Sequence, residues 1–153
     1  MKQHFISLVL FFSFLLSGCM PLKQTEVTSP NGHIRLAFAL DGNNRMTYQV
    51  SVGDTVFIAP SLLGFTAKDG VNLAEGFKVI NTDFTTYDET WTQPWGENKT
   101  IRNHYNEMAV HLSDTTNTQL TLRFRIFDDG LGFRYEYEVP GVDSILVTDE
   151  LTA

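Results

Sequence analysis

Hydrophobic and polar residues alternate along most of the chain from Asn31 onward. The period of two residues is that of side chains pointing to opposite faces of a β-strand. A further segment, residues 77–91, is rich in Thr, Phe and Tyr and is expected to form one or two strands. No segment shows a helical period of useful length, so the pattern predicts an all-β sandwich or barrel. The segments with clear alternation are residues 33–40, 45–52, 55–59, 103–112, 119–127 and 133–139.

Turn-forming residues separate these segments. Asp41 and Gly42 form a strong hairpin signal, and Gly53 with Asp54 marks the next turn. Residues 61–77 are interrupted by glycines and are less regular. Short strands joined by tight turns favour antiparallel pairing of neighbours, so we expect an antiparallel β-sandwich.

The clearest hairpin is expected between the last two alternating segments. Pairing Ile126 with Phe133 brings their apolar faces together and places Arg123 opposite Glu136. A shift of one residue would set apolar side chains opposite polar ones, which is excluded if one face is buried. This register leaves residues 128–131 for the turn.

The N-terminus has the features of a secretory signal. A basic start precedes the apolar run "FISLVLFFSFLL", which is too short for a comfortable membrane span and ends in "LSGC". "LSGC" resembles a bacterial lipobox, in which the signal, residues 1–18, is removed and Cys19 receives lipid. The alternative is that Cys19 is a small buried thiol without a role. We expect a lipid-anchored protein of the bacterial cell envelope, in the periplasm or at the outer membrane, with residues 19–30 as a tether and residues 31–153 as the folded domain.

The charge of the mature chain narrows the range of partners. The chain has 11 Lys and Arg against 18 Asp and Glu. Removing residues 1–18 removes Lys2 alone from this count, which leaves 10 against 18 and a net charge of −8. Nucleic acid is therefore not expected as a partner, because it requires a basic face.

The stretch "WTQPWGENKTIRNHYNEM", residues 91–108, carries the densest set of candidate functional side chains. Pro94 and Gly96 favour a loop over residues 93–100, followed by a strand over 103–112. Aromatic rings at the rim of a sheet can stack on sugar rings, while Glu and Asn side chains can bond to hydroxyl groups. The candidates for carbohydrate binding or a domain interface are Trp91, Trp95, Glu97, Arg102, Asn103, His104 and Glu107.

A structural role for the same residues is the alternative. Trp91 and Trp95 would then cap the core, and Arg102 would pair with Glu97 or Glu107. Buried tryptophans and ion-paired loops are common in folded domains.

Four separated stretches resemble, in the same order, the N-terminal domain of glycoside hydrolase family 97. They are "SPNGHIRLAF", "SLLGF", "PWGENKTIRNHYNEM" and "FRIFDDGLGFRYEYEVPG". The resemblance covers essentially the whole mature chain. It implies a β-super-sandwich similar to galactose mutarotase, in a secreted or lipid-anchored bacterial enzyme that cleaves α-glucosidic or α-galactosidic bonds. In the family this domain packs against a catalytic barrel, a small C-terminal β-domain follows, and a calcium ion sits at the active site.

The resemblance also implies what this chain lacks. It ends where the family's N-terminal domain is about half complete. The acid and base carboxylates of the family lie in the barrel, so no catalytic residue, metal ligand or cofactor is expected here. Calcium is expected in the full-length family enzyme, through a Glu that we place beyond this chain.

Three hypotheses follow. The chain is a truncated part of a family 97 glycosidase, whose partners are the missing barrel, an oligo- or polysaccharide and, through the lipid, the membrane. Alternatively it is a standalone carbohydrate-binding lipoprotein, or a structural surface lipoprotein. Whether it belongs to an active enzyme is left open. Under the first hypothesis, the isolated chain is expected to be marginally stable or to associate.

Overall fold

The computed structural model describes residues 24–152. The predicted signal, residues 1–18, and Cys19 lie outside the described residues. The described chain forms strands with one short 3-10 turn, Lys68–Gly70. The strands are β1 Thr25–Thr28, β2 Ile34–Leu40, β3 Met46–Val52, β4 Thr55–Leu62, β5 Phe65–Ala67, β6 Asn72–Leu73, β7 Lys78–Thr92, β8 Thr100–Ser113, β9 Gln119–Ile126, β10 Leu131–Glu138 and β11 Val147–Glu150.

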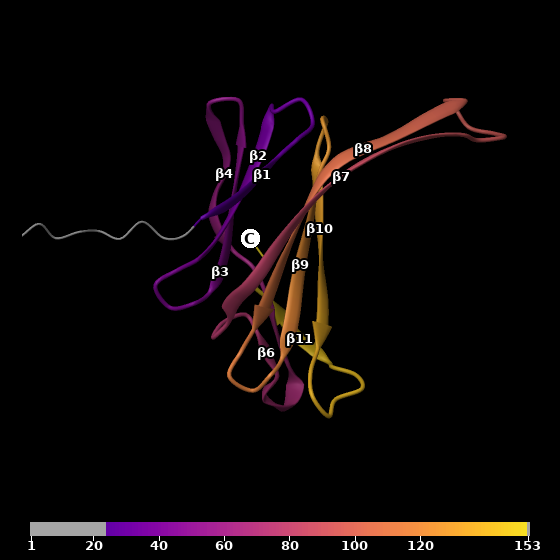
Figure 1. Cartoon of the computed structure of the whole chain (residues 1–153). Coiled ribbons are helices and arrows are strands. Elements are labelled where there is room, and N and C mark those ends of the chain that lie inside the picture. Colours follow the sequence, from indigo (N-terminus) through magenta and orange to yellow (C-terminus); the bar gives the residue numbers. More distant parts are fainter. Residues whose placement is uncertain (1–23, 153) are drawn as a thin grey trace, which may run out of the picture.

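Two four-stranded sheets face each other as the layers of a sandwich (Figure 1). One has the order β1-β2-β3-β4 and the other β10-β9-β8-β7, so within each layer sequence neighbours pair as antiparallel hairpins. A third sheet of order β11-β5-β6 lies at the lower end in Figure 1 and joins segments far apart in sequence. The predicted all-β antiparallel sandwich is confirmed.

The core lies between the two layers, where the alternating apolar residues meet. In β9 the exposure pattern alternates residue by residue, as the sequence predicts. Burying a large apolar side chain contributes about 1.5–3 kcal/mol, so this face dominates the stability of the sandwich. The largest fully buried side chains are Leu36, Phe38, Met46, Leu63, Leu73, Phe77, Met108, Leu112, Leu120, Leu122, Phe124 and Ile126.

The boundary between tether and domain lies earlier than the sequence indicates. β1, Thr25–Thr28, falls inside the predicted tether of residues 19–30 and pairs with β2 from Thr25↔Phe38 to Thr28↔Arg35. Val27 is buried against the core. Four residues with one apolar side chain give almost no periodic signal, because the partner strand supplies the specificity.

The hairpin between β9 and β10 keeps the predicted faces but not the predicted register. Leu131 pairs with Ile126, and Phe133 with Phe124, so the strands meet two residues earlier in β10 than expected. The cause is the turn: Phe127 N donates to Gly130 O at 2.8 Å, which closes a tight loop where a longer one was assumed. A shift of two residues preserves the buried face, since side chains repeat with that period.

In β7 and β8 the predicted elements are present with different bounds. β7 is one continuous strand of 15 residues and β8 begins at Thr100, before the predicted Asn103. The short strands β5, β6 and β11 were not predicted from the alternation of apolar and polar residues, because they are defined by their pairing with other strands. Among residues 24–152 no helix is long and apolar enough to span a membrane.

Candidate functional site

The hairpin of β7 and β8 continues well beyond the sandwich. β9 pairs with β8 no further than Asn106↔Ile126, whereas β7 and β8 stay paired to Thr92↔Thr100. The two-stranded remainder, residues 87–105, is called the arm. Figure 1 shows the arm leaving the body at the upper right and bending away from the β1–β4 layer. At its base, Asn106 Nδ2 donates to the backbone oxygen of Thr28 at 2.8 Å, which fixes the point of departure.

The tip of the arm is a loop closed by one side chain. Gln93 Nε2 donates to Asn98 O at 2.8 Å, and Gln93 N donates to Lys99 O at 3.1 Å. Gly96 passes over this amide with φ +128°, where a Cβ would lie 2.4 Å from Gln93 Nε2. The tip therefore favours glycine at this position, because other residues rarely adopt this backbone angle.

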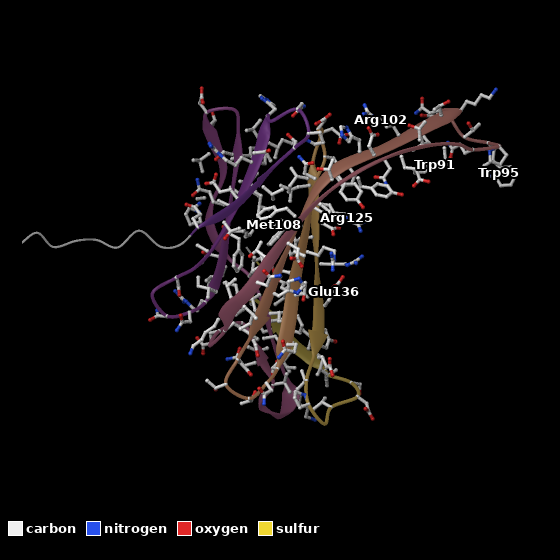
Figure 2. All side chains as sticks on the ribbon, viewed as in Figure 1. Trp91, Trp95, Arg102, Met108, Arg125 and Glu136 are labelled. Carbon is white, nitrogen blue, oxygen red and sulfur yellow. The ribbon has the colours of Figure 1, made fainter. Side chains whose placement is uncertain are left out.

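The two faces of the arm differ in chemistry. Strand pairing puts Tyr87 opposite Tyr105 and Trp91 opposite Ile101 on one face, called the aromatic face. Intervening residues lie on the other, polar face, where Asp88 is opposite His104. Figure 2 shows Trp91 and Arg102 projecting from opposite sides of the ribbon.

An exposed ion pair dominates the polar face. Arg102 donates from Nε and Nη2 to the two carboxylate oxygens of Asp88, at 2.8 and 2.7 Å. The hydrogen bond from Arg102 lowers the pKa of Asp88. Such a fork holds two neighbouring strands in register without burying either group.

Stacked rings form the base of the aromatic face. The rings of Tyr87 and Tyr105 stack with centroids 5.2 Å apart, and Tyr105 meets Phe127 at 5.1 Å. Arg125 covers Tyr105, with Cζ 4.7 Å from the ring centroid. The Tyr87 hydroxyl donates to Glu89, and this hydrogen bond is the main cause that raises the pKa of Tyr87.

Glu107 anchors a charge network where the arm joins the sheet. Its carboxylate accepts from Arg123 Nη1 at 2.6 Å and from Arg125 Nε at 2.7 Å. Burial acts to raise the pKa of Glu107, but the hydrogen bonds from Arg125 and Arg123 together outweigh it and the pKa is lowered.

The network continues to Glu136 on β10. Arg123 donates to Glu136 from Nε and Nη2 at 3.0 and 3.1 Å. Mainly through this contact, with Arg134 adding to it, the pKa of Glu136 falls to about 2. The predicted Arg123–Glu136 pair thus exists, although it runs diagonally because Arg123 is opposite Arg134 in the register.

The seven predicted site residues do not converge on one point. Trp95 and Glu97 lie at the tip, Trp91 and Asn103 on the aromatic face, and Glu107 in the network at the base. Arg102 and His104 share the polar face. They form a surface along the arm and not a pocket.

The contacts expected under the structural alternative are absent for three of them. Trp91 is 44% exposed and Trp95 83% exposed, so neither caps the core. Arg102 pairs with Asp88 and not with Glu97 or Glu107. The sequence does not show this because partners in a β-ribbon are set by register.

Other residues of the surface were missed from the sequence. Tyr87, Tyr105, Arg123 and Arg125 belong to it through ring stacking and the bonds to Glu107. Once residues 77–91 and 103–112 are taken as a hairpin, the alternation places both tyrosines on one face. The arginines follow from the charged face of residues 119–127.

A second polar series lies on the same sheet, away from the arm. His111 Nε2 is 3.0 Å from Asp83 Oδ2, and His111 Nδ1 is 2.9 Å from Thr121 Oγ1. A carboxylate, an imidazole and a hydroxyl group are thus connected in the same order as in a catalytic triad. The backbone N–H groups of these strands lie in the plane of the sheet and not toward Thr121 Oγ1, so no oxyanion would be stabilised there. We assign the series a cross-strand structural role.

The described residues do not fit a calcium site. Within residues 24–152 no group of three or more His, Asp or Glu side chains is placed to hold a metal ion. Both carboxylate oxygens of Glu107 accept from guanidinium groups, which compete with any cation. No step of a reaction is assigned to these residues.

Comparison with known proteins gives a consistent result. Residues 27–153 match the family model described as glycosyl-hydrolase 97 N-terminal. A retaining alpha-galactosidase of Bacteroides thetaiotaomicron is 26% identical over 113 residues, which is 74% of this chain and 16% of that protein.

Solved structures resemble the same region. A glycoside hydrolase family 97 enzyme from Pseudoalteromonas sp. strain K8 in complex with panose superposes with TM-score 0.77 and 32% identity, over 84% of this chain and 20% of that one. The same enzyme in complex with acarbose gives TM-score 0.78 and 31% identity. A beta-arabinopyranosidase, 23% identical with TM-score 0.75, shares the fold. The chain spans about a fifth of the length of these solved relatives.

Proposed function

Because this chain belongs to glycoside hydrolase family 97, as N-terminal domain and not as catalytic part, we propose that it serves a lipid-anchored glycosidase as a carbohydrate-contacting and packing module. Through the arm it contacts sugar and packs against the rest of the enzyme. It does not cleave glycosidic bonds alone.

The arm is the observation that carries this proposal. All 15 residues of β7 but one are exposed, and the arm presents Trp91 and Trp95 to solvent. Large exposed aromatic surface on a projecting element marks a place of contact with another molecule. The core cluster of the described residues includes Met108 of β8, labelled in Figure 2, but no residue of the arm.

The sugar class is supported by the relatives and by the chemistry of the tip. Relatives are described as a retaining alpha-galactosidase and as enzymes bound to panose or acarbose. An exposed indole such as that of Trp95 offers a flat apolar surface to a sugar ring, and Glu97 beside it can accept from hydroxyl groups. We therefore propose α-linked glucosides or galactosides as ligands.

Binding of panose to the full chain tests the sugar contact. We expect Trp95→Ala and Trp91→Ala to weaken binding, measured by calorimetric titration of the detergent-solubilised protein. Phe57→Ala is the matched control, because Phe57 is 76% exposed on β4, away from the arm. Equal binding by all three variants would contradict a sugar role for the arm.

Absence of hydrolysis is tested separately. We expect the purified chain to leave nitrophenyl α-glucoside and α-galactoside intact, since its carboxylates at the base of the arm are bound by arginines. Turnover that survives repurification and disappears in Glu97→Gln or Glu107→Gln would overturn the expectation.

The lipid anchor is part of the same proposal. It is supported by "LSGC" and the lone cysteine at its end. Mass spectrometry of the mature protein should find a lipid on Cys19, and Cys19→Ala should release the protein from membranes. An unprocessed N-terminus would refute it.

A further inference from the structure

A shallow socket lies beside the arm on the outer face of the β7–β10 sheet. Gly132 of β10 is directly opposite Arg125 in the register, and it has no side chain to fill the space between the strands. The result is a depression of about 220 Å³, here called the Gly132 socket. It is lined by Arg123, Arg125, Phe127, Gly132, Phe133 and Arg134.

Nothing in the backbone requires glycine at this position. Gly132 is absent from the glycines with positive φ, and a Cβ built on it would meet no atom within 4 Å. Strand interiors disfavour glycine, and where it occurs it often marks the close approach of a ligand or another backbone. The effect of Gly132 is to keep the socket open.

The socket has one positive charge more than its carboxylates balance. Three guanidinium groups, of Arg123, Arg125 and Arg134, share two carboxylates, those of Glu107 and Glu136, which leaves +1. The whole chain, by contrast, carries −7. Among the hydrogen bonds of residues 24–152, the side chain of Arg125 donates one bond, from Nε to Glu107. Its two terminal amino groups can therefore form a bidentate pair with a further carboxylate.

The position of the socket identifies the source of that carboxylate. The aromatic face of the arm and the socket belong to the same face of one sheet, and in Figure 2 Arg125 and Glu136 lie on the side toward which the arm bends. Polypeptide packed into this angle would contact both the arm and the socket. The solved relatives are about five times as long as this chain, so their remaining polypeptide is available to fill such an angle.

We propose that the Gly132 socket receives the carboxylate of an Asp or Glu side chain from polypeptide packed into the angle between arm and sheet. The carboxylate binds the free amino groups of Arg125, with Phe127 as an apolar wall. This deepens the packing role proposed above and rests on it, but its contact is independent of the tryptophans and of sugar.

A capped tripeptide, acetyl-Gly-Glu-Gly-amide, is the probe. It is titrated into the 15N-labelled full chain in detergent micelles, with the glutamine tripeptide as control. We expect saturable shifts of the Arg125 Nε–Hε and Gly132 amide signals with the glutamate peptide alone. Arg125→Gln should raise the titration midpoint about tenfold.

Gly132→Val is the sharper variant, because it fills the socket and keeps every charge. It should abolish the shifts while unfolding at the same or a higher temperature, since the added Cβ has room. Arg102→Gln, an exposed arginine on the polar face of the arm, should leave the titration unchanged.

Three outcomes would overturn the proposal. Unchanged binding in Gly132→Val would show that the socket is not the site. Equal shifts at Arg102 and Arg125 would show general charge attraction. Tighter binding of glucuronic acid than of the glutamate peptide would assign the socket to an acidic sugar. The panose titration depends on the tryptophans, and the peptide titration depends on Arg125 and Gly132. Either experiment can fail while the other succeeds, so the two proposals are tested apart.

Discussion

One strand, β8, passes through two regions whose surroundings are opposite. From Asn106 to Ser113 it has a partner on each side, and Met108, Val110 and Leu112 are almost fully buried against the other layer. From Thr100 to Tyr105 it pairs with β7 alone, and neither face of this ribbon is covered by the second layer.

The difference shows what each region relies on. In the body, each buried side chain contributes about 1.5–3 kcal/mol, so the alternation of the sequence specifies the fold. In the arm, cross-strand pairs such as Tyr87–Tyr105 contribute about 0.2–1 kcal/mol each. The arm can therefore present exposed groups such as Trp91 and Trp95 outside the core between the layers.

Removal of a core ring should give the largest effect. Phe124 is 0% exposed, and the centroid of its ring lies 6.2 Å from that of Phe38 and 5.8 Å from that of Phe133. We expect Phe124→Ala to lower the free energy of unfolding by about 3–5 kcal/mol, measured by denaturant titration. Trp95→Ala, at the tip of the arm, should change it by less than about 0.5 kcal/mol. Similar losses for both would abolish the distinction between body and arm.

Loss of the charge at the junction should give an intermediate effect. Glu107 has a 10% exposed side chain, and in Glu107→Gln the guanidinium groups of Arg123 and Arg125 lose their shared carboxylate. We expect a loss of about 2–3 kcal/mol in thermal or chemical unfolding. A double-mutant cycle with Arg125→Gln should show coupling, and additive losses would mean that the pair contributes nothing.

Acid should weaken the body through Glu136. Its pKa is lowered from 4.5 to about 2, chiefly by the hydrogen bond from Arg123. A lowered pKa means that the stabilisation is complete above pH 4.5 and is lost as pH falls from 4.5 to 2. Because the side chain is 36% exposed, screening reduces the contribution to about 1 kcal/mol. The difference in unfolding free energy between the wild type and Glu136→Gln should therefore shrink over this range, and a constant difference would count against it.

The smallest effect is expected from the exposed fork of the arm. Arg102→Gln breaks the pair with Asp88, yet both groups are solvated, so global unfolding should not change measurably. Amide hydrogen exchange within residues 87–105 should become faster, because the two strands lose an ion pair that connects them. Faster exchange throughout β9 as well would indicate that the arm and body are one cooperative unit.

The sequence predicts the body well because burial leaves a periodic trace. The strands with alternating residues and their faces were predicted from Leu120, Leu122, Phe124 and Ile126 and their counterparts. The register of the last hairpin was wrong by two residues, since faces repeat with that period and the tight turn at Phe127–Gly130 decided between the possibilities.

The arm was harder to predict, for a physical reason. Trp91 and Trp95 are apolar, and composition alone favours burial for such residues. Their exposure follows from the end of the β8–β9 pairing at Asn106↔Ile126, beyond which β7 and β8 pair only with each other, and this is a feature of the assembled sheet. The partner of Arg102 is likewise fixed by register and not by proximity in sequence.

The pairing order also bears on how quickly the chain can reach its structure. Both four-stranded layers are made of consecutive hairpins, whose ends meet after short loops, whereas β5 and β11 join residues such as Thr66 and Thr148, 82 positions apart. Loop closure costs more entropy as the loop lengthens, so we infer that the hairpins form early and that the third sheet closes late in folding. Pulse-labelled hydrogen exchange should then protect amides of β9 and β10 before those of Phe65–Ala67. Protection in the reverse order would show that the distant strands guide the search instead.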